Sequence, residues 1–117
     1  MDPNVLHNLS YGMYIVSSFS GSKLNGQVAN TVFQITSEPV TVAISINKAN
    51  LTHKFIEESH SFSISVLDES APLSFIGKFG FRSGNTEDKF KGTKFEISNS
   101  GCPIVFDYTI AYMEAKV

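Results

Sequence analysis

Two stretches of the chain alternate strictly between side chains of different polarity, and this alternation constrains the fold more than any other feature. In residues 40–47 every second residue is a large aliphatic one: Val40, Val42, Ile44 and Ile46. In residues 61–67, Phe62, Ile64 and Val66 form one face and serines form the other. A period of two is typical of β-strands. The sequence therefore predicts a mainly β fold.

The remaining segments are consistent with a small antiparallel barrel that has short helices at its corners. Further strands are predicted at residues 11–19, 27–36, 95–97, 104–106 and 108–117, with turn residues at 21–26 and an irregular connection at 80–92. Helices are predicted at residues 2–9, 51–59 and 72–79. The 117 residues have room for one domain, which we expect to occupy residues 1–117.

Composition and charge exclude several classes of protein. The net charge of −2 argues against a nucleic-acid-binding protein, because such proteins need a basic face. No apolar run approaches the roughly 20 residues that span a bilayer, and the N-terminus lacks the pattern of a secretory signal. The single cysteine, Cys102, cannot form an internal disulfide, which fits a cytoplasmic location. One cysteine and three separated histidines supply no zinc site, so no metal is expected.

No familiar catalytic motif is present. The chain has no GxGxxG after a strand and no GxxxxGK[ST], so neither a Rossmann site nor a P-loop is predicted. His7, His53 and His60 each lack a context that would make them a catalytic base. Cys102 has no neighbours that would lower its pKa, and we interpret it as a bystander thiol. We therefore assign no catalytic side chain.

A polar corner joins the strand at 40–47 to the helix at 51–59. Its charges oppose the helix dipole, with basic residues at the start and glutamates at the end: Lys48, His53, Lys54, Glu57 and Glu58. Asn47, Lys48, Asn50 and Thr52, with backbone N–H groups, could surround an anion such as a phosphate. Alternatively, Asn50 is an ordinary helix cap and Lys48 a solvated charge.

Two further stretches could bind a ligand. Asn30, Thr31 and Gln34 are polar members of an otherwise apolar strand, so they face water, another chain or a polar ligand. Phe79 and Phe81 flank Gly80, and Arg82 follows. Aromatic rings beside a bare backbone suit stacking on a planar ring, although anchoring a long loop to the core is their commoner use.

In combination these stretches resemble the flavin reductase-like family of FMN-binding split barrels, which includes flavoredoxins. The matching pieces are "LSYGMYIVSS" at 9–18, "NGQVANTVFQITSEP" at 25–39, "VAISINKANLTHKFIEES" at 42–59, "FSISVL" at 62–67 and "FGFRSGNTEDKF" at 79–90. The resemblance implies an FMN-binding split barrel and noncovalently bound FMN. It also implies cofactor-binding roles for a set of residues. Around the phosphate and ribityl chain would lie Ser45, Asn47, Lys48, Asn50 and Thr52. Along the isoalloxazine edge would lie Ala29, Asn30, Thr31, Val32 and Gln34, and beside the ring or the nicotinamide entry Phe79, Gly80 and Arg82.

The resemblance further implies an FMN-dependent oxidoreductase that passes hydride or electrons from NAD(P)H, a transient co-substrate, to an acceptor. The alternatives are a flavoredoxin-like electron carrier reduced by a redox protein partner, and a non-catalytic split-barrel module for ligand binding or assembly. Family members usually continue past "YTIAYMEAKV", so we expect a barrel that lacks its last strands or is completed by another chain. A homodimer with the flavin near its interface is expected.

Overall fold

The computed structural model describes residues 2–4, 12–85 and 88–117. The helix predicted at residues 2–9 lies mostly outside them. The described residues form eight strands and two helices, in the order β1 Tyr14–Ser20, β2 Lys23–Ala29, β3 Val32–Ser37, β4 Val40–Ile44, α1 Leu51–Ser59, β5 Ser61–Leu67, α2 Leu73–Gly80, β6 Phe95–Ile97, β7 Pro103–Val105 and β8 Thr109–Lys116. The mainly β fold with short helices is thereby confirmed.

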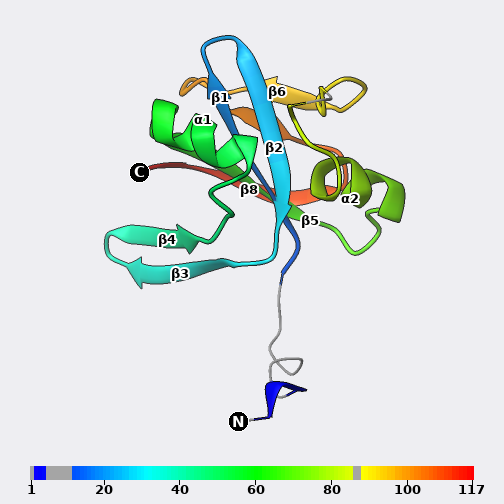
Figure 1. Ribbon diagram of the computed structural model, residues 1–117. Helices are drawn as coiled ribbons and strands as arrows, with labels where there is room; N and C mark the ends of the chain where they lie inside the picture. Colours follow the sequence, from blue (N-terminus) through cyan, green and yellow to red (C-terminus); the bar gives the residue numbers. More distant parts are fainter. Residues whose placement is uncertain (1, 5–11, 86–87) are drawn as a thin grey trace.

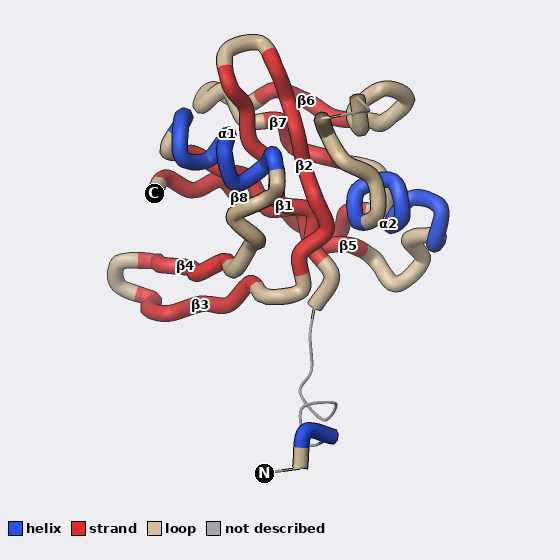
Figure 2. Tube along the Cα trace, in the orientation of Figure 1, coloured by secondary structure: helices blue, strands red, loops and turns tan. Residues whose placement is uncertain are grey.

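The strands form three antiparallel sheets (Figures 1 and 2). A central four-stranded sheet has the order β2-β1-β5-β8, so β2 and β8 are its edges. The β3–β4 hairpin forms a separate ribbon that extends beside this sheet, and β6 pairs with β7. Hydrogen bonding between strands does not close these sheets into one continuous barrel.

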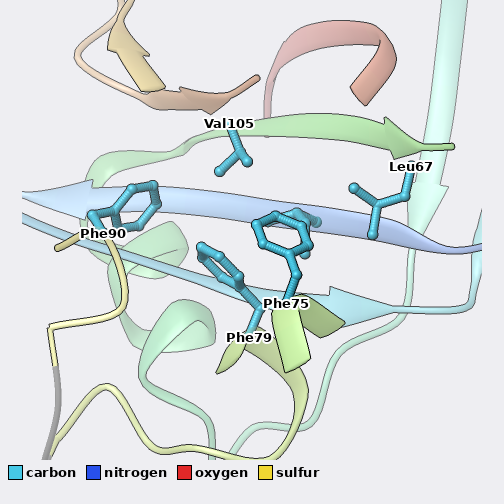
Figure 3. Packing of buried hydrophobic residues seen from close by; sticks show 6 residues of the cluster. Leu67, Phe75, Phe79, Phe90 and Val105 are labelled. Atoms are coloured by element: carbon cyan, nitrogen blue, oxygen red, sulfur yellow. The ribbon is translucent and has the colours of Figure 1, made fainter. Parts of the chain in front are cut away.

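Both faces of the central sheet are covered. On one face the buried residues come from the sheet, from α2 and from the segments that follow it: Ile15, Leu67, Phe75, Phe79, Phe90 and Val105 (Figure 3). On the other face α1 packs against the sheet, and the buried residues are Val16, Ala29, Ile56, Phe62 and Ile64. Because β3 and β4 also pack on this second cluster through Val32, Val42 and Ile44, the ribbon is held beside α1.

The serine face of β5 is buried rather than exposed. Ser63 and Ser65 are each 1% exposed and lie beneath β7. The Ser63 hydroxyl donates to the Pro103 carbonyl at 2.5 Å, and the Ser65 hydroxyl donates to the Val105 carbonyl at 2.8 Å. Side-chain hydrogen bonds therefore join β5 to a strand with which it shares no backbone ladder.

The prediction of one continuous strand over residues 27–36 is wrong. The chain forms β2 up to Ala29, bends at Asn30, and begins β3 at Val32. β2 pairs with β1, whereas β3 pairs with β4, so Asn30 and Thr31 are the point at which the chain passes from one sheet to another. The turn predicted at 21–26 is also shorter, because only Gly21 and Ser22 separate β1 from β2.

Other boundaries differ slightly from the prediction. The strand predicted at 40–47 ends at Ile44, and Pro72 is the N-cap of α2 rather than its first residue. Neither helix in the described part of the chain has the length needed to traverse a bilayer.

Candidate functional site

The corner between β4 and α1 is a compact turn held by its own backbone. The Ser45 N–H donates to the Thr31 carbonyl at 3.1 Å, which joins the corner to the crossing between β2 and β3. The Asn47 side chain accepts the Ala49 N–H at 2.8 Å, and the Asn47 carbonyl accepts the Asn50 N–H at 3.1 Å. Asn47 therefore shapes the turn that leads into α1.

Asn50 is the N-cap residue of α1 by position, but its side chain makes no capping hydrogen bond. Instead its amide nitrogen donates to Gln27 Oε1 on β2 at 3.1 Å. The first N–H groups of a helix have no partner within the helix, so this end of α1 keeps donors and a positive dipole end available to an anion. Within α1, His53 Nδ1 lies 2.9 Å from Glu57 Oε1.

The residue two positions further on, Thr52, faces the protein interior. It is fully buried, and its hydroxyl accepts a hydrogen bond from Asn25 Nδ2 on β2 at 2.8 Å. The hydroxyl therefore fixes α1 to the edge strand. Lys48, by contrast, is exposed in the turn before the helix.

A cavity of about 270 Å³ adjoins the start of α1. It lies along the outer edge of β2, between the first turn of α1 and the segment that follows α2, and we call it the β2-edge cavity. Four of the cofactor-binding residues that the resemblance implies line it together: Asn50, Phe79, Gly80 and Arg82. The structure thus brings the polar corner and the Phe-Gly-Phe-Arg stretch to one place.

Lys89 is the buried cation of this cavity, and sequence reasoning missed it. It is 4% exposed, and its ammonium group donates to the Gly26 carbonyl at 3.0 Å and the Phe79 carbonyl at 3.2 Å. These contacts join the edge of β2 to the end of α2. Lys89 stands in an irregular charged segment, where no periodicity distinguishes a buried lysine from a solvated one.

The charge of the cavity favours an anionic ligand. Among its described lining residues, Arg82 and Lys89 are cationic and none is acidic. The amide side chains of Asn25, Gln27 and Asn50 add hydrogen-bonding groups. Two cations, neutral amides and a helix N-terminus in one concave site are suited to a phosphate.

The other predicted site residues lie outside the β2-edge cavity. Ala29 is buried in the core, while Asn30, Thr31 and Val32 mark the crossing into β3. Gln34 is exposed on β3, where its amide donates to the Thr36 carbonyl at 3.2 Å. Besides these, Ser45 lines a different hollow, and Asn47, Lys48 and Thr52 are placed as described above.

The aromatic residues beside Gly80 have different environments. Phe79 is fully buried, and its ring centroid lies 5.4 Å from that of Phe75 and 5.6 Å from that of Phe90. Phe81 is 83% exposed and also lines the cavity. Phe79 therefore anchors the segment to the core, and Phe81 is the ring that is accessible to a planar ligand.

The thiol of Cys102 does not line the β2-edge cavity. Cys102 is fully buried beside β7, and burial raises the pKa of its thiol. A thiol with a raised pKa is largely protonated at neutral pH, so it is a poor nucleophile. This agrees with its interpretation as a bystander.

Comparison with known proteins identifies the family. The model of the flavin reductase like domain matches residues 6–117. The chain is 55% identical over its full length to the high molecular weight rubredoxin of Moorella thermoacetica, of which it covers 51%. It is 45% identical over its full length to a ferric-chelate reductase (NAD(P)H) of Archaeoglobus fulgidus, of which it covers 69%. The chain thus spans about half to two-thirds of the length of these relatives.

Solved structures agree on the fold. A Streptomyces globisporus NADH:FAD oxidoreductase, solved with NAD and FAD fragments, has a TM-score of 0.83 at 23% identity, over 97% of this chain and 66% of that one. The flavoredoxin of Desulfovibrio vulgaris has a TM-score of 0.80 at 24% identity, over 91% of this chain and 59% of that one. The chain belongs to the flavin reductase like domain family, whose chemistry is flavin-linked oxidation and reduction.

Proposed function

We propose that this chain binds FMN noncovalently and acts as an NAD(P)H:flavin oxidoreductase-type domain. The observation that carries the proposal is the β2-edge cavity, whose lining brings Arg82 and Lys89 beside the N-terminus of α1. The name of the Archaeoglobus relative, a ferric-chelate reductase (NAD(P)H), supports NAD(P)H as the donor.

The residues of the cavity fit the phosphate end of FMN. Lys89 is buried and held by two carbonyls, so its charge is fixed in position before any ligand arrives. Asn50 is held by Gln27, which leaves the first turn of α1 without a side-chain cap from that residue. Preorganised donors of this kind cost little to order on binding.

The ring of the cofactor would then lie toward residues 29–32. This crossing follows Val28, which lines the cavity, and the Ser45–Thr31 hydrogen bond joins it to the corner. Backbone groups at the crossing would address the ring edge, and Phe81 would shield one side. When bound, FMN supplies the redox chemistry, accepting a hydride and passing electrons on. The protein residues bind, orient and limit the access of water.

Substitutions that remove a positive charge from the cavity test the proposal that it binds FMN. Arg82→Gln should raise the Kd for FMN about tenfold or more, because a charge-assisted hydrogen bond contributes about 1.5–3 kcal/mol. Lys89→Gln should raise the Kd less, because the Lys89 ammonium group already donates to two carbonyls and would act on the phosphate through its charge. Lys48→Ala, at an exposed position outside the cavity, should change it only a few-fold. Lys116→Gln on β8 is the matched control. Equal Kd values for all four variants and the native chain would contradict the assignment.

The donor is tested separately. The chain is loaded with FMN, desalted and titrated with NADH and NADPH under argon while flavin absorbance is followed. Bleaching by either nucleotide supports the reductase. A retained flavin that neither nucleotide bleaches would overturn the NAD(P)H step and leave an electron carrier, reduced by a redox protein partner, as the function.

A further inference from the structure

Two amide side chains of the edge strand β2 hold the start of α1. Asn25 and Gln27 are two residues apart on β2, so both side chains lie on the face of the strand that α1 covers (Figure 1). Asn25 Nδ2 donates to Thr52 Oγ1 at 2.8 Å, and Gln27 Oε1 accepts a hydrogen bond from Asn50 Nδ2 at 3.1 Å. The first bond fixes the helix to the strand, and the second fixes the side chain that precedes the helix.

The second bond engages the residue that is placed to cap α1. Asn50 has the extended backbone of an N-cap residue, with φ −82° and ψ 145°, and its carbonyl accepts the Lys54 N–H at 3.4 Å. Asparagine is a preferred N-cap residue, because its side-chain oxygen can accept an N–H of the first turn. Within residues 50–54, all of which the structure describes, the Asn50 side chain makes no such bond. It is held against β2 by Gln27 instead.

The same helix start borders the β2-edge cavity. Ala49, Asn50 and Leu51 line the cavity together with Gln27. A side-chain cap and a bound phosphate both accept hydrogen bonds from the N–H groups of the first helical turn, so each excludes the other. A contact that holds the Asn50 side chain against β2 therefore leaves these N–H groups to an anion in the cavity.

We propose that Gln27 is a positioning residue of the flavin site. It holds the Asn50 side chain away from the start of α1, so that the flavin phosphate accepts the hydrogen bonds of the first turn in place of that side chain. This inference rests on the proposed function, since it takes the phosphate to lie in the β2-edge cavity. Gln27 thus acts on the flavin through Asn50, by removing a competitor before the ligand arrives.

A double-mutant cycle between positions 27 and 50 tests the proposal. Gln27→Met keeps the length of the side chain and removes the acceptor, which releases Asn50 to cap α1. The Kd for FMN is measured by quenching of flavin fluorescence for the native chain, Gln27→Met, Asn50→Ala and the combined variant. We expect Gln27→Met to raise the Kd about fivefold when residue 50 is asparagine and less than about twofold when it is alanine, because alanine has no oxygen that can cap the helix.

Urea denaturation of the flavin-free chains gives a second readout. In the Gln27→Met chain, Asn50→Ala should lower the denaturation midpoint by about 0.5 M, because it removes the cap that Asn50 has formed. The same substitution in the same chain should tighten FMN binding. A role of Gln27 in packing alone would not produce a loss of stability together with a gain of affinity.

The outcomes separate this inference from the proposed function. If Gln27→Met raises the Kd equally in both backgrounds, Gln27 acts on the flavin directly, and the positioning role is overturned while FMN binding stands. An unchanged Kd for Gln27→Met, or an unchanged midpoint when Asn50→Ala is added to that chain, overturns the role in the same way. If the native chain binds no FMN, the proposed function fails, and the positioning role fails with it.

Discussion

Gly84 occupies a position at which the backbone passes directly against the Asn25 side chain. A Cβ atom there would overlap the Asn25 amide, whose nitrogen donates to Thr52. The hydrogen bond between β2 and α1 thus requires a residue without a side chain in a different segment. Because Gly84 also lines the β2-edge cavity, this contact sets the local shape of the candidate site.

The substitution Gly84→Ala should therefore lower the free energy of unfolding by about 1–3 kcal/mol, as overpacking does in a filled site. Gly77→Ala, in α2, is the matched control. Its Cβ would lie 3.4 Å from the exposed Phe81 ring, and alanine should strengthen the helix by up to about 1 kcal/mol. Urea denaturation measures both. Equal stabilities for the two variants would show that the Asn25 contact has no energetic role.

At the residue scale, the sequence predicts which residues belong to the candidate site better than it predicts what surrounds each of them. It selected Asn50 and Arg82, and the structure brings both to one cavity. It selected Thr52 as a ligand group, whereas that hydroxyl is buried against Asn25. Lys89 was missed because its burial depends on carbonyls of Gly26 and Phe79, which lie 63 and 10 residues away along the chain. A local pattern carries no signal for such distant partners.

At the scale of elements, β5 shows how polar side chains can replace a backbone ladder. Ser63 and Ser65 donate to carbonyls of β7, although among the described strands β5 pairs with β1 and β8. We expect Ser65→Ala to cost about 0.5–1.5 kcal/mol of unfolding free energy, because the Val105 carbonyl would lose this donor and keep the Thr109 hydroxyl, which donates to it at 3.0 Å. Ser70→Ala, at an exposed turn, should have almost no effect in the same denaturation experiment. A neutral Ser65→Ala would refute this role.

Local periodicity was sufficient for some elements and insufficient for others. The helix predicted at 51–59 and the strand predicted at 61–67 match α1 and β5, because their apolar spacing reflects real packing on the core. The strand predicted at 27–36 was divided by the change of partner at Asn30. Both halves have strand-like composition, and only tertiary pairing separates them. The burial of the β5 serines was hidden for the same reason, since β7 supplies their partners.

At the scale of the whole molecule, the β3–β4 ribbon carries an exposed apolar face. Val32, on one side of β3, packs on the core, whereas Phe33 and Ile35, on the other, are 54% and 57% exposed. Exposed apolar residues grouped on one ribbon are typical of an interface. We propose that this face pairs with a second copy of the chain, which would bring the crossing at residues 29–32 close to the interface.

Sedimentation velocity at micromolar concentration checks the proposal. The native chain should sediment as a dimer, and Phe33→Asp should shift it to a monomer, because a charge would be buried in the interface. Leu73→Asp is the control, since Leu73 is 76% exposed on α2, away from the ribbon. A monomeric native chain, or a Phe33→Asp variant that remains dimeric, would contradict the interface.

The central claim is that the β2-edge cavity holds the phosphate of a flavin. The most direct measurement is a titration of FMN with the native chain and with Arg82→Gln, followed by flavin fluorescence. The claim predicts saturable binding near one flavin per chain, and a Kd about tenfold higher for the variant. Failure of the native chain to bind FMN, or identical Kd values for the two proteins, would contradict it.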